Sequence, residues 1–191
     1  MSSEAIDNGA RFGRYPPPAD RFSDRFVVML PRLIVLSVML LATTLLPHPV
    51  SAGGLEVRTL AGEESSLGEQ ITRGQWTLVM VWTTYCGVCR EQYPTISEFH
   101  ARHHENDATV LGIALDGYGE ADKVADYRVA QAHNFPSVLA ESDIFAYGFE
   151  RATGEAFTGT PTYLFFDGDG KLRAYLSGPV SDAALERAIQ P

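Results

Sequence analysis

An apolar run that leads directly into two cysteines dictates much of what this chain can become. Residues Trp76–Trp82 (WTLVMVW) contain Thr77 as their only hydroxyl side chain, which is typical of a strand buried on both faces of a sheet. Cys86 and Cys89 follow in the spacing C-x-x-C, and residues 86–104 are predicted to form a helix. A buried strand that continues into a helix predicts an α/β fold with the cysteines at the junction.

Further strands and helices alternate along the rest of the chain. Strands are predicted at Leu55–Leu60, Thr109–Leu115, Pro136–Leu139, Thr162–Phe166 and Leu172–Leu176, the last two joined by a Gly-Asp-Gly turn. Helices are predicted at residues 121–133 and from the cap Ser181 through Ile189, with one or two helical turns at Asp143–Tyr147. Leu55–Leu60 is expected at a sheet edge, and Gly148–Phe157 is expected to be a long loop. The order predicts a mixed central sheet flanked by helices.

The charge of the chain disfavours nucleic acid as a partner. Its 191 residues carry 15 Lys and Arg against 24 Asp and Glu, a formal net charge of −9. Residues 1–52 hold five Arg and four acids, so the remainder carries −10. Nucleic-acid affinity rests on clustered Lys and Arg. We therefore expect no nucleic-acid partner.

The N-terminal residues have the pattern of an export signal. Leu33–Leu46 is an uncharged apolar stretch, shorter than the about 20 residues that a transmembrane helix needs and within the range of a signal-peptide core. Arg32 precedes this stretch, and Val50-Ser51-Ala52 offers small residues for cleavage before Gly53. The alternative is an uncleaved membrane anchor through residues 26–46.

This leader divides the chain into two parts. Residues 1–52 form a tail with a signal peptide or anchor, and residues 53–191 form one domain. Met29 begins a compact export signal of its own, so residues 1–28 are expected to be either a cytoplasmic tail or the product of a mis-assigned start. Whether cleaved or anchored, the domain is expected in the periplasm, on the oxidising side of the membrane.

The two cysteines form either a redox dithiol or half of a metal site. They are too few for a disulfide scaffold, and a structural zinc site needs two further ligands. At the start of a helix, the Cys86 sulfur faces unpaired N–H groups and the positive end of the helix dipole, which lower the pKa of its thiol. Cys89 lies one turn further and is expected to point inward. An exposed sulfur paired with a sheltered one suits thiol–disulfide exchange.

At these residues the chain resembles the thioredoxin superfamily, and within it the exported TlpA/ResA/DsbE-like thiol–disulfide oxidoreductases. The features shared with that group are a buried strand ending in Trp82, an aromatic residue before C-x-x-C, Arg90 after it, Pro94, the segment Gly159-Thr160-Pro161-Thr162 and the D-G-D-G-K turn at 167–171. The resemblance covers most of residues 53–191. It implies a thioredoxin-like fold and activity as a protein-disulfide reductase.

The resemblance also implies a set of site residues. Cys86 and Cys89 are the implied catalytic pair, and Pro161 is implied to follow a cis peptide bond. Contacts with the substrate are implied for Tyr85, Gly87, Val88, Thr160 and Pro161. No metal and no cofactor beyond the Cys86–Cys89 disulfide is expected. The implied partners are protein thiols and disulfides and a membrane electron donor such as a DsbD/CcdA-like protein, which gives the protein a role in thiol homeostasis.

Three positions depart from the pattern of that family. Val88 stands where reductase-like members usually carry Pro, Gln92 where the TlpA/ResA-like group carries Glu, and Met80 where thioredoxin carries a buried Asp. A buried acid accepts the proton of the second thiol. Without one, we expect that step to be slower or to use water. The direction of the reaction stays open between reductase, oxidase and isomerase.

A metal-binding function is the alternative from another class. A Cu(I) metallochaperone would use the two thiolates, with His133 as the only His well downstream. The spacing Cys86-x2-Cys89-x10-His100-x3-His104 imitates a zinc site. In one continuous helix, however, Cys89 and His100 lie about 16 Å apart along the axis, which is too far for one ion. We therefore expect the histidines to form an exposed helix end.

Overall fold

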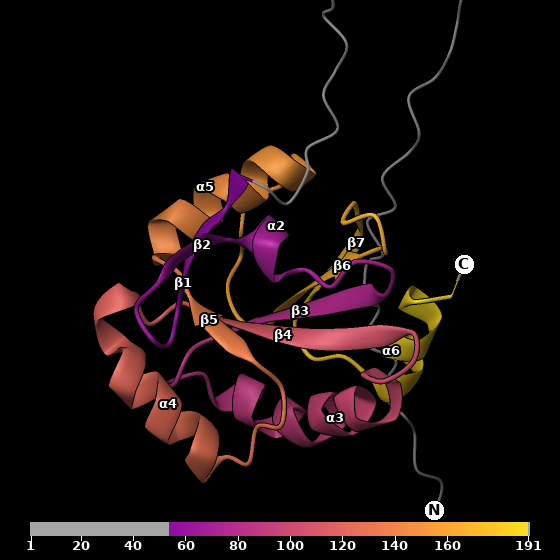
Figure 1. Cartoon of the computed structure of the whole chain (residues 1–191), viewed down its shortest axis with the longest axis horizontal. Helices are drawn as coiled ribbons and strands as arrows, with labels where there is room; N and C mark the ends of the chain where they lie inside the picture. The colour runs from indigo at the N-terminus through magenta and orange to yellow at the C-terminus, as the bar shows by residue number, and fades with distance from the viewer. Residues whose placement is uncertain (1–53, 191) are drawn as a thin grey trace, which may run out of the picture. The chain divides into compact units, whose positions relative to one another are not determined.

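The computed structural model describes residues 54–190, which form a seven-stranded sheet with helices on both faces (Figure 1). The strands are β1 (Glu56–Thr59), β2 (Glu64–Ser66), β3 (Trp76–Trp82), β4 (Ala108–Ala114), β5 (Ser137–Leu139), β6 (Thr162–Phe166) and β7 (Leu172–Ser177). The helices are α2 (Leu67–Gln70), α3 (Gly87–His103), the 3-10 turn η2 (Tyr118–Glu120), α4 (Ala121–Ala130), α5 (Ser142–Thr153) and α6 (Asp182–Ala188). The predicted leader in residues 1–52 lies outside the described residues.

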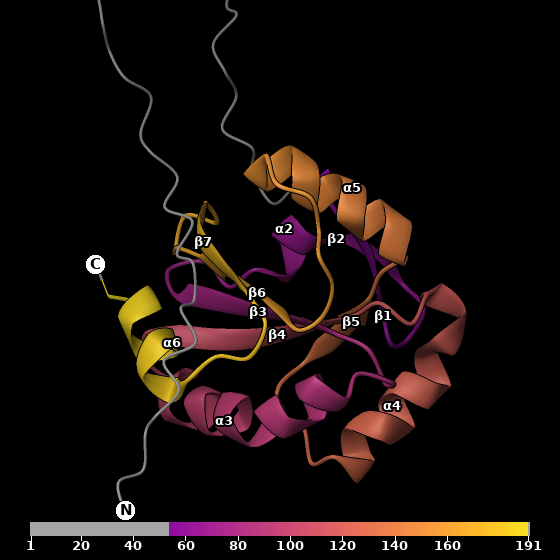
Figure 2. The same ribbon diagram turned by 180° about the vertical axis from the view of Figure 1, so that it is seen from behind.

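The sheet is mixed, as the sequence predicts. Its strand order is β2-β1-β5-β4-β3-β6-β7. β3 and β5 pair with β4 in parallel, and the other neighbouring strands are antiparallel. β3 and β4 therefore lie at the centre (Figure 2). In their register, Trp82 pairs with Ala114, so both strands end at the same edge of the sheet.

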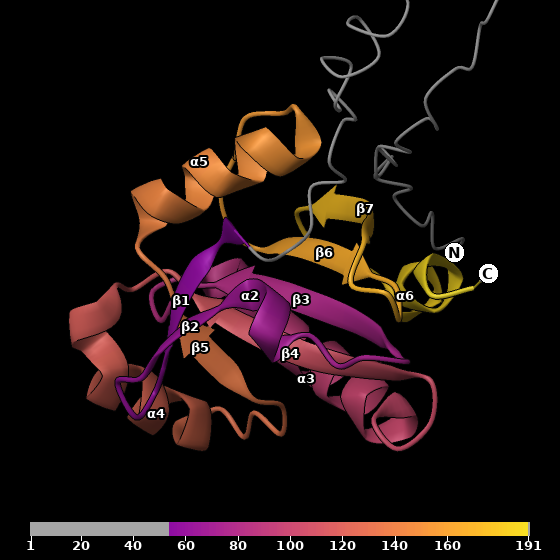
Figure 3. The same cartoon turned by 45° about the horizontal axis from the view of Figure 1, so that its top comes forward.

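Alternate side chains of β3 enter two separate cores. Leu78, Met80 and Trp82 pack on the face covered by α3, α4 and α6, whereas Val79 and Val81 pack on the face covered by α2 and α5 (Figure 3). All five side chains are fully buried. The uninterrupted apolar run in the sequence is explained by this burial on both faces. Within residues 54–190, we find no helix long and apolar enough to cross a membrane.

Two predictions about the sheet edge and α5 are wrong. β1 is internal, because β2 pairs with it on one side and β5 on the other. The polar strand β2 gave no apolar signal, and Gly62, with a φ of 88°, lies in the turn that leads to it. The expected loop Gly148–Phe157 is helical through Thr153. Phe145 and Phe149, spaced one turn apart, are buried and keep the helix on the sheet past Gly148.

Candidate active site

Cys86 and Cys89 lie at the junction of β3 and α3, where the sequence predicts them, and are joined by a disulfide bond. Cys86 is the N-cap residue of α3, and its Sγ accepts a hydrogen bond from the Cys89 N–H at 3.0 Å. Cys86 is half-buried, whereas Cys89 is fully buried. In the reduced protein, the unpaired N–H groups of the first turn favour a thiolate at Cys86 over one at Cys89.

The residues next to Cys86 form an apolar surface. The side chain of Tyr85 is 78% exposed and that of Val88 is 43% exposed, while Gly87 between them is also exposed. Exposed aromatic and aliphatic side chains beside a reactive sulfur suit contact with another polypeptide. The assignment of these three residues to substrate binding stays a prediction.

The loop before β6 lies at the same edge of the sheet. The Thr160–Pro161 peptide bond is cis, as the family resemblance implies. Thr162 pairs with Val81 in the antiparallel β3–β6 ladder, which places Pro161 beside the end of β3 and the start of the cysteine loop. The Thr162 hydroxyl donates to the Gly159 carbonyl at 2.6 Å and fixes this turn. The substrate contacts implied for Thr160 and Pro161 stay predictions.

Gln92 ties α3 to the strand that follows the cis proline. Its Oε1 accepts hydrogen bonds from the Val180 N–H at 2.7 Å and from the Tyr163 hydroxyl at 3.3 Å. Tyr163 is fully buried in β6, and burial raises the pKa of its phenol. The amide that replaces the family's acid therefore has a structural function, because it satisfies two donors from other elements. Met80, the other departure, is fully buried.

Trp82, Tyr93 and His133 form an aromatic cluster between β3, α3 and the segment after α4. His133 lies 3.8 Å from Tyr93 and 5.1 Å from Trp82 between ring centroids. Burial, with a smaller contribution from Arg128, lowers the pKa of His133 to about 4, and burial raises the pKa of Tyr93. Both side chains are uncharged at neutral pH. Trp82 and Tyr93 belong to the same apolar core as the fully buried Cys89.

Asp116 is a residue that the sequence-based reasoning missed. It lies two residues beyond the end of β4, and its side chain is fully buried. The Thr84 N–H donates to Asp116 Oδ2 at 3.0 Å, and the Thr84 hydroxyl donates to Oδ1. Lys123 Nζ lies 3.2 Å from Oδ1, and this hydrogen bond raises the pKa of Lys123. A signal was available, because polar residues just past neighbouring parallel strands meet at one edge of the sheet.

The three histidines near the end of α3 differ in exposure, and only His104 has the exposure that the sequence predicts for all of them. His100 is buried, and its Nδ1 accepts a hydrogen bond from the Val110 N–H at 3.2 Å. The aromatic core beneath α3 extends to this position, which the residue type alone did not indicate. His103 is half-buried, and His104 is exposed. Among the described residues, no three His, Cys, Asp or Glu side chains gather as a metal-binding group.

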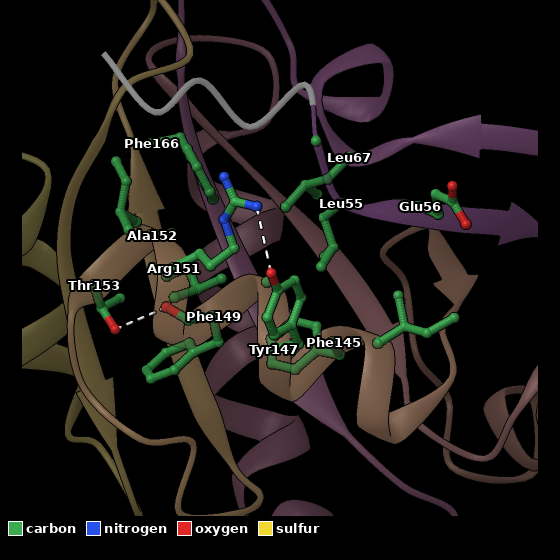
Figure 4. A pocket seen from close by; sticks show the side chains of 15 residues that line it. Leu55, Glu56, Leu67, Phe145, Tyr147, Phe149, Arg151, Ala152, Thr153 and Phe166 are labelled. Carbon is green, nitrogen blue, oxygen red and sulfur yellow. Dashed lines mark hydrogen bonds between the residues drawn. The ribbon is translucent and has the colours of Figure 1, made fainter. Parts of the chain in front are cut away.

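Two hollows flank the sheet. A groove of about 650 Å³ beside the dithiol is lined by Thr84, Tyr85, Lys123, Asp126, Tyr127 and Ala130. A cavity of about 500 Å³ lies on the α5 side and is lined mainly by apolar side chains such as Phe149 and Phe166 (Figure 4). There, Arg151 is directed toward Tyr147 and donates to its hydroxyl at 3.5 Å. None of the site residues predicted from the sequence lines this cavity, so only the groove belongs to the candidate active site.

The chain is similar to known thiol–disulfide oxidoreductases. It is 25% identical over 138 residues to the thiol-disulfide oxidoreductase YkuV of Bacillus subtilis, and this match covers 68% of this chain and 88% of that protein. It is 22% identical over 131 residues to the sporulation thiol-disulfide oxidoreductase A of the same organism, and this match covers 68% of this chain and 74% of that protein.

A solved structure confirms the thioredoxin-like fold. The thiol:disulfide interchange protein of Chlorobium tepidum TLS, described as a thioredoxin family protein, superposes with a TM-score of 0.60 at 23% identity. The match covers 74% of this chain and 94% of that one. The AhpC/TSA family matches residues 51–175, a range that contains the central strands, the C-x-x-C motif and the cis-proline loop. The chain belongs to the AhpC/TSA family.

Proposed function

We propose that this protein is a thiol–disulfide oxidoreductase that acts on the disulfides of other proteins. The observation that carries the proposal is the unequal environment of the two sulfurs. Cys86 is half-buried at the N-terminus of α3 and accepts the Cys89 N–H, whereas Cys89 is fully buried. The family membership and the names of the relatives support the same activity.

The proposed reaction proceeds in two exchanges. The Cys86 thiolate attacks one sulfur of a substrate disulfide, that S–S bond breaks, and the released substrate thiolate takes up a proton. Cys89 then loses its proton and attacks Cys86, which forms the Cys86–Cys89 disulfide and releases the second substrate thiolate. The substrate gains two electrons and the dithiol loses two. The two sulfurs carry out both steps, so the proposed reaction needs no other cofactor.

The proposed direction is reduction of the substrate in the periplasm, with the domain exported by the predicted leader. A membrane donor of the DsbD/CcdA-like type would return two electrons to the Cys86–Cys89 disulfide. Tyr85, Gly87, Val88, Thr160 and Pro161 are the proposed contacts with the substrate polypeptide. The apolar exposure of Tyr85 and Val88 supports this assignment, as does the place of Pro161 beside the cysteine loop.

Trapping of the mixed disulfide tests the function. The Cys89→Ser variant should accumulate disulfide-linked complexes between Cys86 and a protein substrate such as insulin, because the second exchange is blocked. The Cys86→Ser variant should neither form complexes nor reduce insulin. Trapping by Cys86→Ser instead would reverse the assigned roles. Tight stoichiometric Cu(I) binding without any exchange activity would replace the proposal with the metallochaperone alternative.

Two further measurements test direction and location. The reduction potential of the Cys86–Cys89 pair separates the alternatives, since known values run from about −270 mV for thioredoxin to about −120 mV for a strong oxidant. A reductase requires a potential near the lower end. For export, a fusion of residues 29–60 to a reporter that is active only outside the cytoplasm should be active. Export that requires residues 1–28 as well would show that the tail belongs to the signal.

A further inference from the structure

The ends of the two central strands bring a buried carboxylate to the cysteine loop. Trp82 of β3 pairs with Ala114 of β4 in a parallel ladder. Two residues beyond this pair, the chains reach Thr84 on one side and Asp116 on the other. Thr84 lies two residues before Cys86, so any group that holds Thr84 also restricts the path of the loop to the sulfur.

The contacts between Thr84 and Asp116 use both donors of Thr84. The backbone N–H donates to Oδ2 at 3.0 Å, and the hydroxyl donates to Oδ1. Lys123 of α4 adds a third donor at 3.2 Å from Oδ1. The Asp116 side chain is fully buried, whereas that of Lys123 is 51% exposed. Because a buried carboxylate is costly without donors, these contacts are strongly favoured in the folded protein.

We propose that Asp116 is a positioning residue for the attacking sulfur. By holding Thr84 it fixes the loop of residues 83–86 between β3 and α3. The Cys86 N–H donates to the Thr83 carbonyl at 3.2 Å in the same loop, and Cys86 Sγ accepts the Cys89 N–H at 3.0 Å. The place of the sulfur over the first-turn N–H groups therefore depends on the path of this loop. The inference rests on the proposed function, in which Cys86 is the attacking residue.

Lys123 balances the charge of this arrangement. A carboxylate near Cys86 would by itself disfavour a thiolate, and the ammonium of Lys123 on the same oxygen opposes that effect. Lys123 also pairs with Glu120 at 3.4 Å, and both Lys123 and Thr84 line the groove beside the dithiol. Of this pair, Lys123 thus lines the groove together with Tyr85, the residue before Cys86.

The pH dependence of Cys86 alkylation tests the proposal without requiring exchange activity. In a Cys89→Ser background only one thiol remains, and its rate with iodoacetamide reports the thiolate fraction. Thr84→Val removes the hydroxyl donor without changing any charge. We expect it to raise the pH midpoint of alkylation and to lower the rate at pH 7 about three- to tenfold, the effect of a weakened cap interaction. Thr84→Ser keeps both donors and should restore the wild-type profile.

The neighbouring threonine provides a matched control. Thr83 is buried, whereas Thr84 is half-buried, and the Thr83 hydroxyl has no hydrogen-bond partner among the described residues. Thr83→Val therefore makes the same chemical change without removing such a bond. The Thr83→Val profile should coincide with that of the parent. An unchanged profile for Thr84→Val, or an equal shift for Thr83→Val, would overturn the positioning role. Failure of insulin reduction alongside the expected alkylation shift would instead count against the proposed function only.

Discussion

The amide of Gln92 should stabilise the fold by a measurable amount, since it joins α3 to β6 and to the loop before α6. Gln92→Leu keeps the approximate volume but leaves the Tyr163 hydroxyl and the Val180 N–H without their acceptor. Tyr163 is fully buried and Val180 is half-buried, so the first loss is the larger one. An unsatisfied buried donor costs about 1–3 kcal/mol, and a partly exposed one costs less. We expect Gln92→Leu to lower the free energy of unfolding by about 2–4 kcal/mol.

Urea unfolding of the oxidised protein, followed by circular dichroism, measures this difference. With a slope of about 2 kcal/mol per molar urea, the middle of the typical range, the midpoint should fall by about 1–2 M. Gln92→Glu retains an acceptor oxygen and should lose less than about 1 kcal/mol at pH 7. Gln131→Leu is the matched control, because the Gln131 side chain makes no hydrogen bond among the described residues. Equal losses for Gln92→Leu and Gln131→Leu would refute the assignment of a structural role to the amide.

Two other perturbations test the core and the α3–α6 contact. Gly112→Ala would place a Cβ 2.3 Å from Ser137 Oγ, so it should lower the stability measured by thermal unfolding by about 1–3 kcal/mol. Adding Ser137→Ala to the same chain should recover part of that loss. Purely additive effects of the two substitutions would contradict the steric explanation. Burial alone would lower the pKa of His103, but hydrogen bonds to Asp107 and Glu186 raise it overall. The stabilisation of the fold by charged His103 is therefore complete below the unfolded pKa of 6.5 and is lost as the pH rises through the folded pKa. We expect His103→Gln to lower the free energy of unfolding more at pH 5.5 than at pH 9. A loss that does not depend on pH would argue against the charged contact.

Local patterns in the sequence predicted the centre of the molecule well. β3 has the predicted bounds, because burial on both faces leaves an uninterrupted apolar run of strand length. The N-cap position of Cys86 follows from the same run, since the helix begins after the strand ends. The cis bond before Pro161 came from the family resemblance, because sequence alone cannot distinguish it from an ordinary trans proline.

The features that could not be predicted depend on contacts between distant segments. β2 consists of Glu64–Ser66 and exists because β1 offers it a free edge, not because its residues favour a strand. The burial of His100 depends on the neighbouring strand, whose Val110 N–H it accepts. Asp116 becomes significant only when the parallel register brings it to Thr84. In each case the partner is far away in the sequence, and residue type does not reveal it.

The different surroundings of the two sulfurs predict which step limits the rate of exchange. On the Cys86 side, the fold provides helix N–H groups and a balanced Asp116–Lys123 pair. Cys89 is instead fully buried in an apolar core, where loss of solvation disfavours the charged thiolate. Attack by Cys86 is therefore favoured by the fold, whereas ionisation of Cys89 is not. Proton removal from Cys89 should limit turnover, and lifetimes of mixed disulfides should shorten as the pH rises.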